Sequence, residues 1–222
     1  MRAKETELER VFNSYRKTGK KYDCLVSLSG GLDSTYALYL CKEIYGLRIL
    51  AFNFDNGFQP ELTKQNLKNA VKDLDADFVS YKPDWKLASK LYGLFFRKTG
   101  YFCTPCIAGI RSMSYKFAKD LGIPLIVRGA AERVEVQFPE GGSPNPPRST
   151  SYFKQVIRGE ISCTEAADYL HAPNILEKGL SRISTHFPVN RQIRTINLND
   201  YLEWDRQTIL KVLESELNWK HA

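Results

Sequence analysis

Short apolar segments alternate along the chain with longer segments of helical spacing, and this alternation restricts the fold more than any other feature of the sequence. The apolar segments, which have the length and residue types of buried strands, span residues 22–28, 48–54, 77–82 and 124–129. The helical segments span residues 32–44, 60–74, 85–96 and 104–121. Strands that alternate with helices pair in parallel through crossover connections. The sequence therefore predicts an α/β fold, a doubly wound parallel sheet with helices on both faces.

The alternation ends after Gly129. Residues 139–150 are rich in Gly, Pro and Ser, which predicts a loop beside whatever the sheet binds. Short helices are expected between residues 151 and 180, followed by an apolar stretch at 195–198 and a helix near 206–217. We accordingly divide the chain into a sheet domain, residues 1–135, and a loop with a small helical extension, residues 136–222, which packs on the same domain.

Composition agrees with a folded domain. The chain has 222 residues, of which 43% are hydrophobic and 26% charged, so a packed core is expected and general disorder is excluded. No window approaches the ~18 consecutive apolar residues of a membrane helix, and the charged N-terminal segment lacks the apolar core of a secretory signal. These features predict a cytoplasmic protein without a membrane partner.

Basic residues outnumber acidic ones. The 32 Lys and Arg against 25 Asp and Glu give a formal net charge of +7. Such an excess favours anionic partners, which include nucleotides, sugar nucleotides and RNA. It does not choose among them, and a solvated basic face without any partner fits the charge equally well.

Between the first expected strand and the first expected helix lies the hexapeptide Ser29-Gly30-Gly31-Leu32-Asp33-Ser34. Consecutive glycines let the backbone turn tightly and approach a phosphate without a Cβ in the way. The start of the following helix offers unpaired N–H groups to an anion. Ser29 and Ser34 can add hydroxyl donors, and Asp33 can hold a magnesium ion against the phosphates. A bare Gly-Gly pair would indicate only a turn, whereas this whole hexapeptide predicts a phosphate loop.

The hexapeptide resembles the SGGxDS motif, or PP-loop, of the N-type ATP pyrophosphatases, and the resemblance covers roughly residues 20–135. It implies the adenine nucleotide alpha hydrolase-like fold and cleavage of ATP between its α- and β-phosphates. AMP is then placed on a carbonyl oxygen of the substrate, from which a nucleophile displaces it. The resemblance further implies that the nucleotide lies by Phe54 and Asp55, that Gly129 contacts it, and that the protein is a homodimer.

Charged residues follow the fourth expected strand, at the edge where the ligand is expected. Arg128 or Arg133 could clamp pyrophosphate or an anionic substrate, since a guanidinium group matches phosphate geometry. Glu132 could assist magnesium. Salt bridges on a solvated helix start are an equal alternative for these residues. Asp55 likewise has two interpretations, as a catalytic residue at the mouth of the site or as part of an ordinary turn.

The five cysteines are odd in number and accompany no secretion signal, which argues against a disulfide framework. Cys24 and Cys41 are expected to be buried and inert. Cys103 and Cys106 open a helix in the segment Cys103-Thr104-Pro105-Cys106, in which Thr104 is the expected N-cap. The helix dipole would then lower the pKa of the Cys106 thiol. Cys163 lies in a capping-box pattern, Ser162 to Glu165, that predicts another helix start.

Three thiols at helix starts suit a metal or sulfur site, although simple packing remains an alternative. The segment from Cys103 to Gly129 resembles the tRNA-thiolating branch of the PP-loop family. That resemblance implies a 4Fe–4S cluster or a persulfide relay at Cys103, Cys106 and Cys163. Our leading hypothesis is therefore that sulfur from a donor partner replaces the activated oxygen of a tRNA or an anionic small molecule.

Two other functions stay open. FDNGF at residues 54–58, with TINLNDYLEW and ELNW later in the chain, resembles the N-acetyl sugar amidotransferase branch. That resemblance implies amide or amidine formation on a nucleotide sugar, with ammonia from a separate glutaminase and structural cysteines. The third possibility is a nucleotide-binding regulatory module without turnover.

Overall fold

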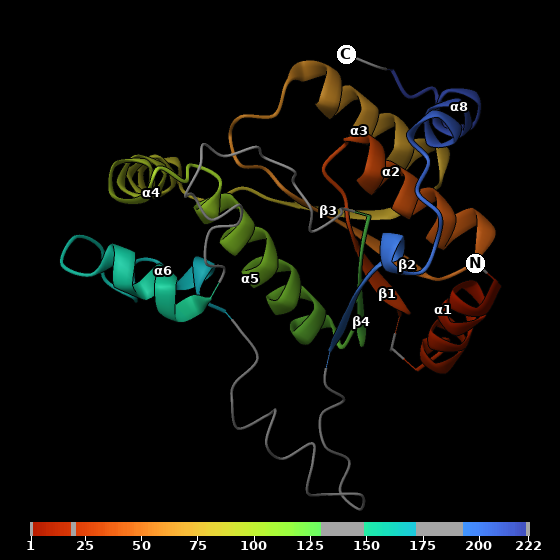
Figure 1. Ribbon diagram of the computed structural model, residues 1–222, viewed down its shortest axis with the longest axis horizontal. Helices are drawn as coiled ribbons and strands as arrows, with labels where there is room; N and C mark the ends of the chain where they lie inside the picture. The colour runs from red at the N-terminus through yellow and green to blue at the C-terminus, as the bar shows by residue number, and fades with distance from the viewer. Residues whose placement is uncertain (1, 19–20, 130–148, 172–192, 221–222) are drawn as a thin grey trace, which may run out of the picture.

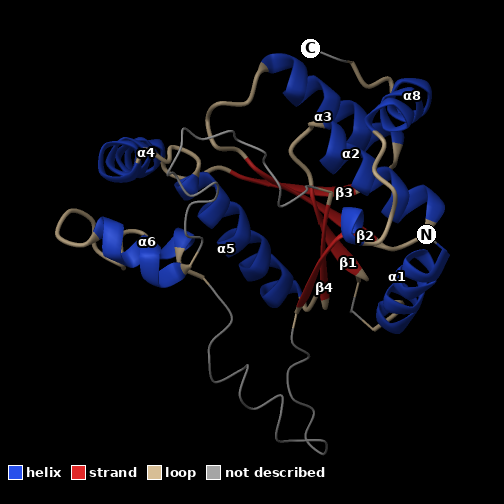
Figure 2. Cartoon of the chain, in the orientation of Figure 1, coloured by secondary structure: helices blue, strands red, loops and turns tan. Residues whose placement is uncertain are grey.

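The computed structural model describes residues 2–18, 21–129, 149–171 and 193–220. Five strands form a single sheet in the order β3-β2-β1-β4-β5, and every neighbouring pair is parallel. The strands are β1 (Cys24–Ser27), β2 (Ile49–Phe54), β3 (Asp77–Tyr81), β4 (Leu125–Arg128) and β5 (Arg194–Asn197). Figure 2 shows them as the red layer between helices. The predicted α/β class with a parallel sheet is therefore confirmed.

Helices cover both faces of the sheet (Figure 1). One face carries α1 (Arg2–Tyr15), α2 (Leu32–Tyr39) with its π-helical continuation η1 (Leu40–Ile44), α3 (Glu61–Asp73) and α8 (Arg206–Leu217). The other carries α4 (Trp85–Thr99), α5 (Thr104–Leu121), α6 (Thr150–Ile157) and the 3-10 turn η2 (Ala167–Tyr169). A second 3-10 turn, η3 (Leu198–Asp200), follows β5. Helix α1 was not predicted, whereas α2 with η1, α3, α4 and α5 lie where their apolar spacing placed them.

Alternation along the strands divides the buried side chains into two cores. Cys24 and Val26 of β1 pack with α1, α2, α3 and α8, whereas Leu25 packs with α4, α5 and α6. Successive side chains of a strand point to opposite faces of its sheet, which is why one strand supplies both cores. Because each face is covered by helices, the central strand β2 is buried along its whole length rather than on alternate residues.

Local capping fixes several helix ends. Asp84 and Asp205 accept hydrogen bonds from the amides of Leu87 and Thr208 at the starts of α4 and α8, at 2.8 and 2.7 Å. Gly100 and Gly122 end α4 and α5 in the left-handed conformation, with φ of 73° and 66°. These residues set where α4 and α8 begin and where α4 and α5 end.

The strand order changes direction at β1, which pairs with β2 on one side and with β4 on the other. From β1 to β3 successive strands add on one side, and β4 and β5 add on the other. Open parallel sheets bind ligands at such a topological switch point, outside the carboxyl ends of the strands. The Ser29–Ser34 hexapeptide follows β1 and Gly129 follows β4, so both lie at this point. Within the described ranges, no helix combines the length and the apolarity needed to span a bilayer.

Candidate functional site

The two serine hydroxyls organise the hexapeptide from within. Ser34 Oγ accepts a hydrogen bond from the Ser29 amide at 3.0 Å, lies 2.9 Å from Ser29 Oγ and donates to the Gly31 carbonyl at 3.1 Å. Ser29 Oγ accepts from the Gly31 amide at 3.3 Å. Gly31 is the N-cap residue of α2 and provides no side-chain cap. The first turn of α2 therefore keeps donors that its own N-cap does not satisfy, which is the local arrangement of an anion site.

Both glycines at the switch point are required by close backbone contacts. Gly30 has φ of +83°, and a Cβ there would lie 2.3 Å from the Thr63 carbonyl oxygen of α3. A Cβ on Gly129 would lie 2.0 Å from the carbonyl oxygen of Asp33. The ends of β1 and β4 are thus packed directly onto the helices beside the hexapeptide, and Gly129 is necessary for packing whether or not it also meets a nucleotide.

Asp33 is held by a tryptophan from the far end of the chain. The Trp204 indole Nε1–H donates to Asp33 Oδ1 at 2.7 Å. Among the described residues, the second oxygen, Oδ2, has no hydrogen-bond partner. Carboxylate oxygens are the ligands that magnesium prefers, so the half-buried Asp33 side chain fits the predicted role of metal ligand.

The C-terminal segment makes further bonds to the hexapeptide and to α3. The Trp219 indole Nε1–H donates to the Gly30 carbonyl oxygen at 3.2 Å. The Asn66 amide nitrogen donates to the Lys220 carbonyl oxygen at 2.8 Å, and the Lys220 amide donates back to Asn66 Oδ1 at 2.9 Å. The tryptophan-containing motifs did not predict this role in the site. Their donors meet the hexapeptide only in the folded chain.

A turn after β2 connects the hexapeptide to the cysteines. Asp55 Oδ1 accepts from the Gly57 amide at 3.0 Å, and Gly57 has φ of +83°, so this segment forms a turn at the end of β2. Gln59 Nε2 donates to the Ser29 carbonyl oxygen at 3.3 Å. Asn56 Nδ2 donates to the Cys106 sulfur at 3.4 Å. One short segment therefore links the phosphate loop with the start of α5.

Cys103 and Cys106 lie at the start of α5, as predicted, but their environment differs from the prediction. Cys103, not Thr104, occupies the N-cap position, because the chain enters the helix one residue earlier than expected. Cys103 is exposed and Cys106 is partly buried. Burial raises the pKa of the Cys106 thiol, and the Asn56 hydrogen bond offsets this only in part. The predicted lowering of this pKa by the helix dipole is therefore wrong.

The three-cysteine metal site is not assembled. No group of three or more His, Cys, Asp or Glu in the described part of the chain is placed to hold a metal ion. Cys163 is exposed and lies in the turn after α6, where Ser162 Oγ accepts from the Glu165 amide at 3.0 Å. Glu165 pairs with Lys90 on α4 at 3.8 Å. The expected capping bond exists, but it stabilises a turn that packs on α4 instead of bringing Cys163 to Cys103 and Cys106.

The remaining predicted residues are placed as follows. The Phe54 ring is buried and packs against Gly109 of α5, where a Cβ would lie 2.4 Å from it, so its side chain belongs to the core. Cys24 and Cys41 are both buried, as predicted. Arg133 and Glu132, together with most of the predicted loop 139–150, lie outside the described residues. Arg128 is the last residue of β4 and is half-buried.

Three buried hydroxyls lie on elements that meet at the start of α5. Tyr92, Thr104 and Tyr169 are 2%, 5% and 4% exposed, and none of their hydroxyls has a hydrogen-bond partner among the described residues. Interaction with Cys106 contributes, after burial, to a raised pKa of both Tyr92 and Tyr169. Cys106 is therefore surrounded by buried hydroxyl groups. Sequence patterns did not indicate this feature.

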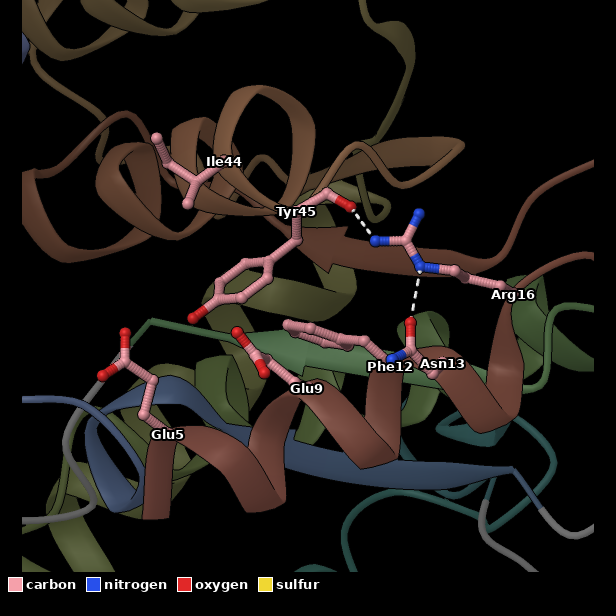
Figure 3. Close-up of a pocket in the computed structure, with 7 residues that line it drawn as sticks. All are labelled: Glu5, Glu9, Phe12, Asn13, Arg16, Ile44 and Tyr45. Carbon is pink, nitrogen blue, oxygen red and sulfur yellow. Dashed lines mark hydrogen bonds between the residues drawn. The ribbon is translucent and has the colours of Figure 1, made fainter. Parts of the chain in front are cut away.

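A cavity of about 290 Å³ lies apart from this site, between α1 and η1 (Figure 3). Its lining includes Glu5, Glu9 and Tyr45, and burial together with both carboxylates raises the pKa of Tyr45 to about 12. Arg16 closes one side, where its Nε donates to Asn13 Oδ1 at 3.0 Å. The cavity is at the opposite end of the continuous α2–η1 helix from the hexapeptide, so it is not part of the candidate site.

Comparisons with known proteins give limited similarity. No family model matches the chain. A protein of Methanocaldococcus jannaschii, described as uncharacterized protein MJ1599, is 28% identical over 123 residues, which are 55% of this chain and 43% of that protein. Among solved structures, the NH3-dependent NAD synthetase of Campylobacter jejuni covers 98% of this chain and 93% of its own, with a TM-score of 0.46 and 12% identity.

Proposed function

We propose that the chain is an enzyme that binds ATP with its phosphates at the Ser29–Ser34 hexapeptide and cleaves it between the α- and β-phosphates. The observation that carries the proposal is the position of this loop. It lies at the switch point of a parallel sheet, at the start of α2, with its serine hydroxyls hydrogen-bonded to each other and Gly30 in close contact with the backbone of α3.

The residues of the loop have distinct roles in this proposal. Gly30, Gly31 and the first-turn amides of α2 receive the phosphate oxygens, and the hydroxyls of Ser29 and Ser34 supply further donors. Asp33 holds the magnesium ion through a carboxylate oxygen. When bound, magnesium neutralises charge that develops on the departing pyrophosphate. AMP is transferred to a carbonyl oxygen of the acceptor, and Asp55 lies beside the reaction at the mouth of the site.

We further propose that sulfur replaces the activated oxygen, with Cys103 and Cys106 as the working pair. A sulfane-sulfur donor, itself a persulfide, passes its outer sulfur to the exposed Cys103 sulfur and leaves as a thiol. The terminal sulfur of the Cys103 persulfide then attacks the adenylated carbon and displaces AMP. Cys106 then attacks the Cys103 sulfur, which breaks the persulfide bond, leaves sulfur on the acceptor and forms a Cys103–Cys106 disulfide. An external thiol reduces that disulfide. Residues three apart at a helix start are close enough for such a bond, and Cys163 has no part in this route.

Amide formation is the second candidate, and one observation favours it. Burial raises the pKa of the Cys106 thiol, and Asn56 of the turn after β2 donates to its sulfur. This arrangement also suits a purely structural cysteine that holds the turn in place. Ammonia supplied by a separate glutaminase would then attack the adenylated carbon of a nucleotide sugar.

The decisive experiment measures AMP formation from ATP and Mg²⁺ in two separate mixtures. One contains bulk tRNA, a sulfane-sulfur donor (thiosulfate with a rhodanese) and a thiol reductant, and the other contains pooled nucleotide sugars and ammonium chloride. AMP that forms only with tRNA, and that is lost in Cys103→Ser but kept in Cys163→Ser, supports sulfur transfer. AMP that forms only with nucleotide sugars, in both variants, supports amidation. Binding of ATP with no AMP in either mixture would leave a nucleotide-binding module.

Asp33→Ala tests the phosphate loop itself. Loss of a direct metal ligand is expected to lower AMP and pyrophosphate formation by roughly 100-fold or more. The fold should persist, because Asp33 is half-buried on the surface of α2 and lies outside both cores. Circular dichroism checks the fold and a pyrophosphate assay checks turnover. Normal pyrophosphate release in a folded Asp33→Ala protein would disprove the assignment of the loop.

A further inference from the structure

The contact between Trp204 and Asp33 joins the C-terminal segment to the hexapeptide. The indole Nε1–H and the carboxylate Oδ1 are 2.7 Å apart, although the two residues are separated by 171 positions. The Trp204 ring also packs edge-on against Tyr36 of α2, with ring centroids 5.3 Å apart. Tyr36 lies one helical turn after Asp33, so the indole is fixed by two contacts to the start of α2.

This arrangement distinguishes the two oxygens of Asp33. A hydrogen bond to an ionised acceptor is among the stronger kinds, and it occupies Oδ1. In the described structure Oδ2 makes no hydrogen bond, so it is the oxygen that a cation can take without displacing a protein donor. A carboxylate fixed in this way loses little further freedom when it binds a metal ion.

We propose that Trp204 is a positioning residue that orients the Asp33 carboxylate and presents Oδ2 to the magnesium ion bound with ATP. The inference rests on the proposed function, because it concerns the cation that accompanies ATP. It adds a role for the C-terminal segment, whose indole acts on the metal through Asp33 and touches neither metal nor substrate. Removal of the N–H group then weakens magnesium binding and leaves metal-independent nucleotide binding unchanged.

Trp204→Phe tests the role, because it removes the N–H donor and keeps an aromatic ring against Tyr36. The probe is the α,β-methylene analogue of ATP, which cannot be cleaved between these phosphates, and calorimetry measures its binding at several Mg²⁺ concentrations. We expect the variant to need about tenfold more Mg²⁺ than the wild type for half-maximal enhancement of binding. Affinity without Mg²⁺ should not change.

Trp219→Phe is the matched control. Trp219 also donates from its indole to the hexapeptide, but to the Gly30 carbonyl oxygen rather than to Asp33. The same chemical change there should alter analogue affinity equally with and without Mg²⁺, so that the Mg²⁺ requirement stays as in the wild type.

A spectroscopic measurement reports on the hydrogen bond without turnover. The chain has three tryptophans, so ¹⁵N-labelled indole groups give three resonances, which the Trp85→Phe, Trp204→Phe and Trp219→Phe variants assign. Asp33→Asn should shift the Trp204 resonance in the absence of any ligand, because a neutral amide oxygen is a weaker acceptor. Addition of Mg²⁺ with the analogue should shift the same resonance.

The possible failures are distinguishable. If the wild type does not bind the analogue, the proposed function is overturned and the role of Trp204 with it. If the analogue binds and Trp204→Phe has the wild-type Mg²⁺ requirement, only the role of Trp204 is overturned. A lower Mg²⁺ requirement in Trp204→Phe would also overturn that role, since the indole would then compete with the metal for Asp33.

Discussion

Single residues determine whether the hexapeptide can adopt its shape. The Ser34 hydroxyl makes three hydrogen bonds within the loop. It accepts from the Ser29 amide, bonds to the Ser29 hydroxyl and donates to the Gly31 carbonyl. Gly30 is needed because it has no side chain: its positive φ and the nearby Thr63 carbonyl both exclude one. At this scale the geometry of the site depends on hydroxyls and missing Cβ atoms, so conservative-looking substitutions should be costly.

Gly30→Ala and Gly159→Ala form a matched pair at the residue scale. Their φ values are +83° and +84°, but nothing lies within 4 Å of a Cβ at Gly159. Backbone strain alone should cost Gly159→Ala about 1 kcal/mol. Gly30→Ala adds the clash with Thr63 and should lose about 3 kcal/mol. Urea unfolding measures both, and equal losses would show that the close contact relaxes freely.

At the scale of elements, one buried carboxylate joins three of them. Asp23, just before β1, is 3% exposed. Its carboxylate accepts from the Lys17 amide after α1 at 2.7 Å, and from the amide and the guanidinium group of Arg48 before β2 at 3.0 and 2.7 Å. Burial alone would raise the pKa of Asp23, but these hydrogen bonds outweigh it and lower that pKa below its usual value. Asp23 thus fixes the starts of the central strands.

The lowered pKa of Asp23 sets the direction in which the stability of the fold changes with pH. A group whose pKa is lower in the folded than in the unfolded chain stabilises the fold above its unfolded pKa, about 3.9 for Asp, and loses this effect as pH falls through the folded pKa. Asp23→Asn should therefore cost about 2 kcal/mol at pH 7, and its difference from the wild type should shrink below about pH 4. Urea unfolding between pH 3 and pH 7 measures this, and a constant difference would contradict it.

At the scale of the whole molecule, one sheet unites two cores. Leu213 of α8 belongs to the core shared with α2 and α3, and Leu91 of α4 to the core shared with α5. Both are fully buried. The strands contribute alternate side chains to both cores. Neither layer of helices can therefore detach without exposing one apolar face of the sheet to water.

Leu213→Ala and Leu91→Ala should accordingly each destabilise the entire described fold. The expected loss is about 2–5 kcal/mol for either variant, in a single transition that tryptophan fluorescence and far-ultraviolet circular dichroism report at the same denaturant concentration. Separate transitions in one variant would show that the two faces unfold independently.

The sequence by itself determined the strand–helix order, the parallel sheet and the place of the hexapeptide at a strand end, because hydrophobic periodicity and glycine chemistry are local properties. Only the tertiary structure decided which distant groups meet. Trp204 reaches Asp33 and Asn56 reaches Cys106, whereas the turn that contains Cys163 packs on α4 and leaves the expected three-cysteine group unformed. Spacing along the chain specifies a helix start, but the pKa of Cys106 depends on what the fold buries it against, and that is set by packing between elements far apart in sequence.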